Sequence, residues 1–202
     1  MENFFDIIIS TFFKDILEKF GGADSKYTTL RIYISSLFLT FLIMGIFFIL
    51  KKENRKIGLI LIFTFIITFL LNEVGIKQIF KRVRPWIYFY SEIAKNTNTP
   101  LNSYCPGFLI TSYSFPSGHC AITSAGAFSL LFYYIFIDKK QNKTLKLYTI
   151  IGFIVLSLVF LSRLALLHHY FTDCLVGTFE GLLIALIVVF ITHIILKKKE
   201  SI

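Results

Sequence analysis

The amino-acid sequence contains little cysteine and little charge, and each shortage argues against a class of protein. The three cysteines, Cys105, Cys120 and Cys174, are dispersed and include no CxxC pair, which argues against a disulfide framework and against a cysteine-based zinc or redox site. Charged residues make up 16% of the chain, below the roughly 25% of an average soluble domain. Acidic residues are fewer than basic ones, 12 against 21. The acidic residues form no cluster in the sequence that would suit a cation site.

Apolar residues are correspondingly abundant, and their proportion indicates an integral membrane protein. Hydrophobic residues make up 55% of the 202 residues and the mean hydropathy is +0.72, whereas soluble domains contain roughly 45–50% apolar residues. A helix that crosses a bilayer needs about 20 mostly apolar residues. The sequence offers five such stretches: Tyr33–Leu50, Ile57–Ile76, Ala121–Ile137, Leu147–Leu167 and Phe171–Leu196. We therefore predict an all-α, polytopic transmembrane helix bundle with five spans and no internal repeat.

The segment before the first span, Asn3–Phe20, has the pattern of an amphipathic helix. Its apolar residues recur every three or four positions and share one helical face, opposite a face of charged and polar residues. We expect this helix to lie in the membrane interface, although its apolar half, Phe4–Phe13, leaves a sixth span open. The start has no basic n-region or small-residue cleavage site, so we expect the segment to be retained. The predicted domains are an N-terminal helix and linker, residues 1–32, and a membrane domain, residues 33–202.

The basic residues between the spans indicate the orientation in the membrane. Short cytoplasmic loops carry an excess of Lys and Arg, and eleven such residues lie in three short polar segments on one side of the predicted bundle. They are Lys51, Lys52, Arg55, Lys56, Lys139, Lys140, Lys143, Lys146, Lys197, Lys198 and Lys199. This side is predicted to be cytoplasmic, which places the histidines His119, His168 and His169 on the outer face.

Three groups of polar residues converge on the outer ends of the spans, and the first is basic. Lys77, Lys81 and Arg84 fall at i, i+4 and i+7 and share one helical face if the helix continues to Pro85. Three cations on one face repel each other unless an anion lies between them. Taken alone, such a cluster after a span also suits binding of lipid headgroups.

The second group is the start of the third span, Phe115-Pro116-Ser117-Gly118-His119. Proline, serine and glycine at a helix start leave backbone N–H groups at the positive end of the helix dipole, which suits a phosphate, although an ordinary helix start has the same composition. His119 adds a titratable imidazole in the first turn of a membrane helix, where such a group needs a partner or a task.

The third group joins the last two spans and contains Arg163, His168, His169 and Asp173. His169 and Asp173 are four residues apart and can meet on one helical turn, where the carboxylate would orient the ring and stabilise its cation. A single pair of this kind is often structural. Three groups on one membrane face favour a catalytic site, because separate structural explanations would all have to hold at once.

These residues resemble the motifs of the type 2 phosphatidic acid phosphatase family, membrane lipid phosphatases that share their active site with the vanadium-dependent haloperoxidases. The family pattern is K-x6-RP, PSGH and SR-x5-H-x3-D. The matching residues are Lys77 with Arg84-Pro85, Pro116-Ser117-Gly118-His119, and Ser162-Arg163 with His169 and Asp173. The resemblance covers the chain from about the second to the fifth span. His168 has no counterpart in the pattern.

The resemblance implies a role for each matching residue. The implied phosphate-binding residues are Lys77, Arg84, Ser117, Gly118 and Arg163, which would stabilise the charge of an in-line transition state. The implied catalytic residues are His169, which attacks phosphorus to give a phosphohistidine, His119, which protonates the leaving group and later activates water, and Asp173, which orients His169. No metal and no cofactor is expected, because the Lys and Arg side chains take the place of magnesium.

Two acidic residues lie within the predicted spans, and a structural role is expected for each. Glu73 lies four residues before Lys77 and is expected to pair with it along the helix. Glu180, flanked by Gly177 and Gly181, is expected to face the bundle because a carboxylate is costly in lipid. A role of Glu180 in substrate binding stays open.

The expected function is hydrolysis of a lipid phosphomonoester or diphosphate at the outer face of a bacterial inner (cytoplasmic) membrane, with the lipid bilayer but no nucleic acid as partner. Family analogy ranks undecaprenyl diphosphate first, and phosphatidylglycerophosphate, phosphatidic acid and lipid A phosphates are the alternatives. A different class is an anionic-lipid transporter or flippase, which would use the basic cluster for binding alone and would need neither His119 nor the His–Asp spacing. A haloperoxidase fits less well, because those enzymes are soluble.

Overall fold

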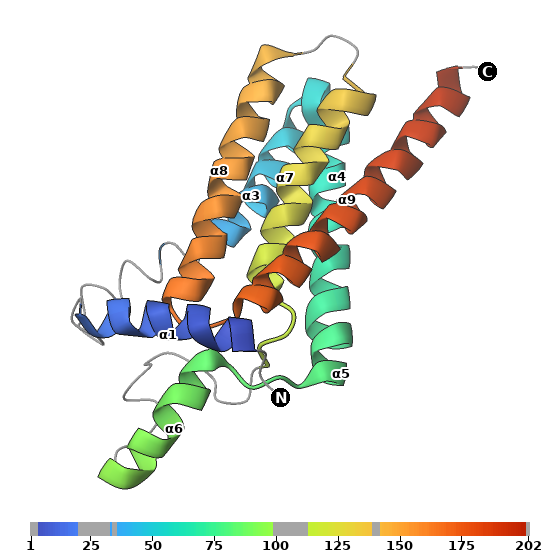
Figure 1. Cartoon of the computed structure of the whole chain (residues 1–202). Helices are drawn as coiled ribbons and strands as arrows, with labels where there is room; N and C mark the ends of the chain where they lie inside the picture. Colours follow the sequence, from blue (N-terminus) through green and yellow to red (C-terminus); the bar gives the residue numbers. More distant parts are fainter. Residues whose placement is uncertain (1–3, 20–32, 34–35, 99–112, 139–141, 201–202) are drawn as a thin grey trace.

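The regular elements of the computed structural model are helices throughout its described part, which excludes residues 1–3, 20–32, 34–35, 99–112, 139–141 and 201–202. Four stretches are long and apolar enough to cross a membrane: Lys52–Ser91, Gly118–Phe136, Lys143–Ala165 and Phe171–Lys199. The predicted all-α, multi-pass architecture is therefore confirmed (Figure 1).

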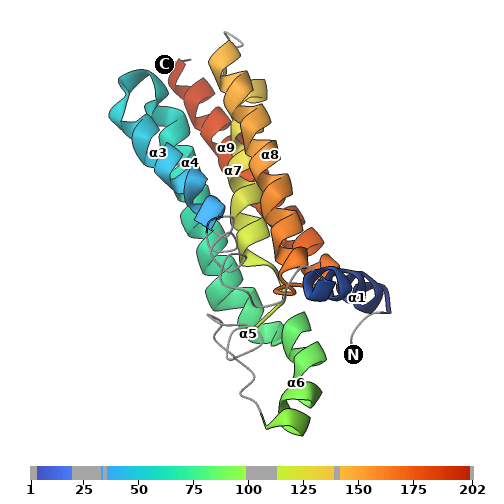
Figure 2. The ribbon, with the colours of Figure 1, turned by 90° about the vertical axis from the view of Figure 1, so that its left-hand side faces the viewer.

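The first predicted span is shorter than expected. It corresponds to the apolar helix Leu37–Leu50, which combines the 3-10 turn η1 (Leu37–Leu39) with α3 (Thr40–Leu50). At 1.5 Å per residue this helix rises about 21 Å, less than the ~30 Å of a hydrocarbon core. The 3-10 turn η2 (Lys52–Asn54) joins it to α4 (Arg55–Phe69), and the two helices lie side by side (Figure 2).

The central helix of the bundle is α7 (Gly118–Phe136), which packs against α4, α8 (Lys143–Ala165) and α9 (Phe171–Glu200). Two glycines bring α9 into backbone contact with it. A Cβ on Gly177 would lie 2.4 Å from the Ser117 carbonyl oxygen, and one on Gly181 would lie 2.1 Å from that of Ala121. Small residues four apart are a common means of close packing between membrane helices. Here they fix the start of α9 against the start of α7.

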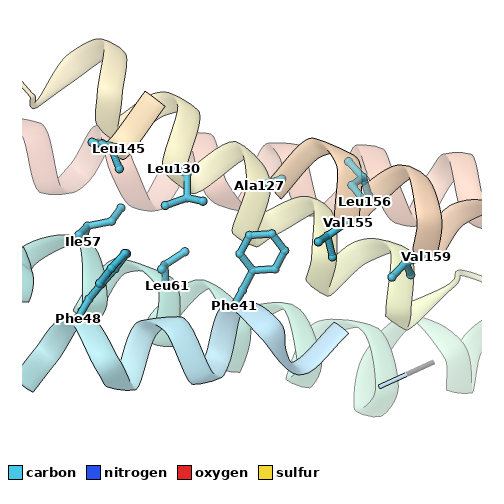
Figure 3. Packing of buried hydrophobic residues seen from close by; sticks show 10 residues of the cluster. All are labelled: Phe41, Phe48, Ile57, Leu61, Ala127, Leu130, Leu145, Val155, Leu156 and Val159. Atoms are coloured by element: carbon cyan, nitrogen blue, oxygen red, sulfur yellow. The ribbon is translucent and has the colours of Figure 1, made fainter. Parts of the chain in front are cut away.

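A cluster of buried apolar side chains joins α3, α4, α7 and α8 (Figure 3). Phe41 of α3 lies against two glycines: a Cβ on Gly126 would lie 2.1 Å from the Phe41 ring, and one on Gly152 would lie 3.3 Å from it. The cluster consists of Phe41, Phe48, Ile57, Leu61, Ala127, Leu130, Leu145, Val155, Leu156 and Val159. The cluster thus holds α3, α4, α7 and α8 together as one bundle.

The predicted N-terminal helix is present as α1 (Phe4–Lys19), which lies across one end of the bundle in both views (Figures 1 and 2). Its apolar side chains, including Phe5, Ile8 and Phe12, are exposed, whereas Asp6 and Ser10 are buried. Two residues of its polar face, Asp6 and Ser10, are therefore turned toward the protein, whereas Asp15 on the same face is exposed. The placement of α1 in a membrane interface stays a prediction.

Candidate active site

The predicted site residues meet at the end of the bundle that α1 crosses. Lys77, Arg84, Ser117, Gly118, Arg163, His169 and Asp173 are buried there, and His119 is partly exposed. They come from the segment after α4, the start of α7, the end of α8 and the start of α9. The positive charges of Arg163, Lys77 and Arg84 act on both His119 and His169, so the three sequence groups form one site.

The segment that carries Lys77 and Arg84 does not form one continuous helix. α4 passes into a π-helix, η3 (Leu70–Ile76), and a short helix α5 (Lys77–Phe80), and Lys81 then adopts a left-handed conformation with φ 45°. A new helix, α6 (Pro85–Thr97), starts at the proline, and Arg84 before it is extended with ψ 150°, as the proline ring requires.

The prediction that Lys77, Lys81 and Arg84 share one helical face is therefore wrong. Lys77 and Arg84 are buried, whereas Lys81 is exposed. The break at residues 81–84 turns the chain so that Arg84 reaches the loop between α8 and α9.

Lys77 is paired with Glu73, which confirms the predicted i, i+4 contact. This pair lies at the start of α7, because a Cβ on Gly118 would be 2.5 Å from Glu73 Oε1 and 3.4 Å from Lys77 Nζ. A residue larger than glycine would therefore displace the pair. The Lys77 ammonium is thus held beside the first amides of α7, where the helix dipole is positive.

Ser117 occupies the N-cap position of α7, but its side chain makes no capping hydrogen bond. Its backbone N–H donates instead to the Asp173 carbonyl oxygen at 3.0 Å. The first three N–H groups of a helix have no partner within that helix. The Ser117 hydroxyl and the first amides of α7 therefore offer hydrogen-bond donors to an anion.

His169 is held in one tautomer by the backbone. Its Nδ1 lies 2.6 Å from the Ser114 carbonyl oxygen, which can only accept, so Nδ1 carries the proton. Its Nε2 keeps a lone pair and lies 3.4 Å from Arg84 Nη1. Burial lowers the pKa of His169 well below its usual range, and the positive charges of Arg84, Lys77 and Arg163 lower it further. The ring is therefore neutral at neutral pH, the state that a nucleophilic nitrogen needs.

Asp173 and His169 lie close together, as their spacing predicts, but they make no direct hydrogen bond. Asp173 Oδ2 lies 3.8 Å from His169 Nδ1, beyond hydrogen-bond distance. The carboxylate instead accepts hydrogen bonds from the Ser114 hydroxyl and from the Tyr170 N–H at 2.8 Å. Ser114 therefore links the two residues, since its hydroxyl binds Asp173 while its carbonyl binds His169. No motif in the sequence indicates Ser114, which directly precedes Phe115-Pro116-Ser117-Gly118-His119.

His168 is a second residue of the site whose contacts the sequence motifs do not predict. It is buried, its Nδ1 lies 3.2 Å from Arg163 Nη1, and its carbonyl oxygen accepts from Arg84 Nη1 at 3.0 Å. Because arginine only donates, His168 Nδ1 is the acceptor. Burial lowers the pKa of His168 well below its usual range, with a further contribution from Arg163 and Arg84, which keeps the ring neutral. His168 thus orients two of the three cations.

His119 extends from the first turn of α7 toward the short apolar helix. Its ring lies 4.5 Å, centroid to centroid, from that of Phe38 in η1, tilted by 58°. Its carbonyl oxygen accepts from the Thr123 hydroxyl at 2.7 Å. His119 is partly exposed and lies near His169. Both properties suit a group that exchanges a proton with a substrate that His169 attacks.

Glu180 faces the bundle, as predicted. Its Oε2 accepts a hydrogen bond of 2.7 Å from Asn72 Nδ2 in the π-helix η3, and Asn72 is fully buried. This contact ties α9 to the segment that carries Lys77.

The donor set at the site suits an anion better than a cation. No group of three or more His, Cys, Asp and Glu residues able to hold a metal ion occurs among the residues that the structure describes. Metal independence nevertheless stays a prediction. The arrangement brings three cations, a helix start and a neutral imidazole together, and such a set of groups suits a bound anion such as phosphate.

Comparison with known proteins identifies a family of membrane phosphatases to which the chain is similar. The model of the PAP2 superfamily matches residues 56–197. An undecaprenyl-diphosphatase of Sulfolobus acidocaldarius is 31% identical over 64% of this chain and 52% of its own length. A PA-phosphatase related-family protein of Dictyostelium discoideum is 35% identical over 43% of this chain and 34% of its own length. The chain thus spans about half the length of the Sulfolobus relative and about a third of the length of the Dictyostelium relative.

A solved structure shares the fold. The transmembrane PAP2 type phosphatidylglycerolphosphate phosphatase from Bacillus subtilis aligns with a TM-score of 0.63 at 25% sequence identity, over 91% of this chain and 82% of its own. The alignment therefore includes nearly all of this chain.

Proposed function

The chain belongs to the PAP2 superfamily, and from this premise we propose that it hydrolyses the phosphate ester or diphosphate of a membrane lipid. The observation that carries the proposal is the environment of His169. Its Nε2 is unprotonated because Nδ1 donates to the Ser114 carbonyl, and it lies beside Arg84, within the field of Lys77 and Arg163. A neutral nucleophile among fixed cations suits attack on a phosphate.

The first half of the proposed reaction is attack of His169 Nε2 on phosphorus. The bond from phosphorus to the leaving oxygen breaks as the new P–N bond forms, and His119 donates a proton to that oxygen. Lys77, Arg84 and Arg163 neutralise the charge on the three remaining phosphate oxygens, with the Ser117 hydroxyl and the Gly118 amide as further donors.

The second half releases phosphate. His119, now deprotonated, takes a proton from a water molecule that attacks the phosphorus of the phosphohistidine, and the P–N bond breaks. Asp173 acts through Ser114 rather than directly, and it supports the positive imidazole of the intermediate. The residues of the site supply every group that these two steps require.

Undecaprenyl diphosphate is the proposed substrate, and the name of the Sulfolobus relative supports it. Phosphatidylglycerophosphate is the first alternative, because a structure that shares the fold is described as a phosphatidylglycerolphosphate phosphatase. Phosphatidic acid and lipid A phosphates follow. An anionic-lipid transporter is the proposal of a different class, and it would bind these lipids without releasing phosphate.

We expect the purified protein in detergent to release inorganic phosphate from this lipid panel in the presence of EDTA. We also expect vanadate to inhibit it, because vanadate adopts the five-coordinate geometry of the transferring phosphoryl group. Measurement of phosphate release from each lipid, with EDTA and with added magnesium, tests both points. Loss of activity in EDTA that magnesium restores would refute the metal-free mechanism, and lipid binding without release would favour the transporter.

The proposed topology has five spans, with the short helix Leu37–Leu50 as the first, and the site on the outer face of a bacterial cytoplasmic membrane. The basic segments predicted to be cytoplasmic belong to the α3–α4 turn, the connection from the end of α7 to the start of α8, and the C-terminal end of α9. The α3–α4 turn, the end of α7, the start of α8 and the end of α9 lie at the end of the bundle opposite α1, α5 and α6 (Figures 1 and 2). The positive-inside rule then supports an outward site, where a lipid phosphate enters from the outer leaflet.

Single cysteines at Asn98 and Asn142 are expected to label oppositely with an impermeant thiol reagent on intact cells, in a background without the three native cysteines. Both positions are exposed, Asn98 at the end of α6 and Asn142 at the start of α8. The expected result is a reactive Asn98→Cys and a protected Asn142→Cys, with both reactive after permeabilisation. The reverse pattern would place the site in the cytoplasm.

A further inference from the structure

One buried carboxylate of α1 reaches the candidate active site. Asp6 is fully buried, although α1 exposes its apolar side chains. Burial of a charge is tolerated where the charge is paired and hydrogen-bonded. Asp6 Oδ2 lies 2.9 Å from Arg82 Nη2, and its two oxygens accept hydrogen bonds from the Thr172 N–H at 3.0 Å and the Thr172 hydroxyl at 2.5 Å.

Arg82 connects Asp6 with both groups that orient His169. Its Nη1 donates to Asp173 Oδ1 at 2.6 Å, and its carbonyl oxygen accepts from the Ser114 N–H at 2.8 Å. Its guanidinium lies 4.0 Å above the Tyr170 ring. The side chain of Arg82 thus fixes Asp173, and its main chain fixes Ser114.

Asp6 also stabilises the start of α9. Thr172 lies in the first turn of this helix, where the backbone N–H groups have no partner within the helix. Asp6 supplies the acceptor that an N-cap side chain usually supplies, but it does so from another helix. Asp173 is the next residue, so the position of its carboxylate depends on that turn.

We propose that Asp6 is a positioning residue for His169: it holds Arg82 and the first turn of α9 so that the hydrogen bonds from Asp173 through Ser114 to His169 stay aligned. The inference rests on the proposed phosphatase function. The hydrogen-bond partners of Asp6 in the described part of the chain are Arg82 and Thr172, neither of which belongs to the phosphate-binding set. Loss of Asp6 therefore acts on the nucleophile and spares phosphate binding.

The kinetic test compares Asp6→Ala with Asp15→Ala, an exposed carboxylate on the same helix. Asp6→Ala is expected to lower kcat about tenfold, since a small misplacement of a reacting group slows catalysis strongly, while the inhibition constant of inorganic phosphate changes less than twofold. Asp6→Asn keeps an acceptor for Thr172 but loses the charge, so its kcat is expected to lie between that of Asp6→Ala and that of the parent. Asp15→Ala should match the parent.

A double-mutant cycle tests whether Asp6 acts through Arg82. In an Arg82→Ala background, Asp6→Ala should lower kcat by a smaller factor than it does in the parent, because the path through Arg82 is already lost and only the contact of Asp6 with Thr172 remains. Independent, multiplicative losses would overturn the inference. An unchanged kcat in Asp6→Ala, or equal losses of kcat and phosphate binding, would overturn it as well.

A structural measurement keeps the inference separate from the proposed activity. Hydrogen exchange of the peptide that contains Thr172 should become faster in Asp6→Ala and stay unchanged in Asp15→Ala, because only Asp6 accepts from the Thr172 N–H. Unchanged protection in Asp6→Ala would overturn the inference whatever the enzyme does. A parent protein that releases no phosphate from any lipid of the panel would refute the proposed function, and the exchange data would still decide whether Asp6 holds this turn.

Discussion

Replacement of His169 by asparagine is expected to abolish phosphate release and to leave the protein folded and able to bind inorganic phosphate. The asparagine amide can still donate to the Ser114 carbonyl, as His169 Nδ1 does at 2.6 Å, but it offers no nucleophile. A bond that forms only during the reaction contributes to the rate and not to ground-state binding. The expected loss in kcat is at least about 10³-fold, measured as phosphate release from the best lipid of the panel.

The matched control is His193→Asn, because His193 lies on α9 near Phe136, toward the opposite end of the bundle. This variant should retain the parental rate. A rapid alkaline quench with labelled substrate, which preserves the acid-labile P–N bond, should trap phosphoenzyme in the parent and none in His169→Asn. A His169→Asn protein that kept more than a few per cent of the parental rate would refute the phosphohistidine mechanism.

Much of the bundle could be predicted from the sequence, because a bilayer requires long apolar helices. The predicted span Ala121–Ile137 corresponds to α7, Gly118–Phe136, and Leu147–Leu167 corresponds to α8, Lys143–Ala165. The break at residues 81–84 was not predicted, although Pro85 is visible in the sequence. The preceding π-helix and the left-handed Lys81 depend on how this segment meets the loop between α8 and α9, which no local pattern encodes.

The residues of the site could be predicted to converge, but their connections could not. Motif spacing placed His169 and Asp173 on one turn, yet His169 Nδ1 donates its hydrogen bond to the carbonyl oxygen of Ser114, 55 residues earlier. Asp6 meets Thr172 across 166 residues. Such contacts follow from the packing of whole helices and leave no periodicity in the sequence. The nearest indication for His168 was its place between Arg163 and His169, which did not reveal that it accepts from Arg163.

Removal of the Arg84 guanidinium is expected to have the second-largest effect, a loss of about 10²-fold or more in kcat/KM, as for other groups that stabilise a transition-state anion. Arg84 is buried and held by the His168 carbonyl at 3.0 Å, so its charge is preorganised beside His169 Nε2. Arg84→Ala should also weaken competitive inhibition by inorganic phosphate, which His169→Asn should leave intact. Removal of the charge of Lys77 or of Arg163 is also expected to lower kcat/KM.

Arg84→Lys separates charge from geometry. A lysine restores the positive charge, but its flexible ammonium lacks the rigid, planar guanidinium that holds Arg84 Nη1 beside both the His168 carbonyl oxygen and His169 Nε2, so it should recover only part of the loss. Arg55→Ala is the control, because Arg55 begins α4 at the other end of the bundle and its Nε lies 3.4 Å from the Ile49 carbonyl oxygen. If Arg84→Ala kept kcat/KM within twofold of the parent, the cations could not be the groups that stabilise the transferring phosphate. A full recovery in Arg84→Lys would mean that charge alone suffices there, and that the contact between Arg84 and His168 has no part in catalysis.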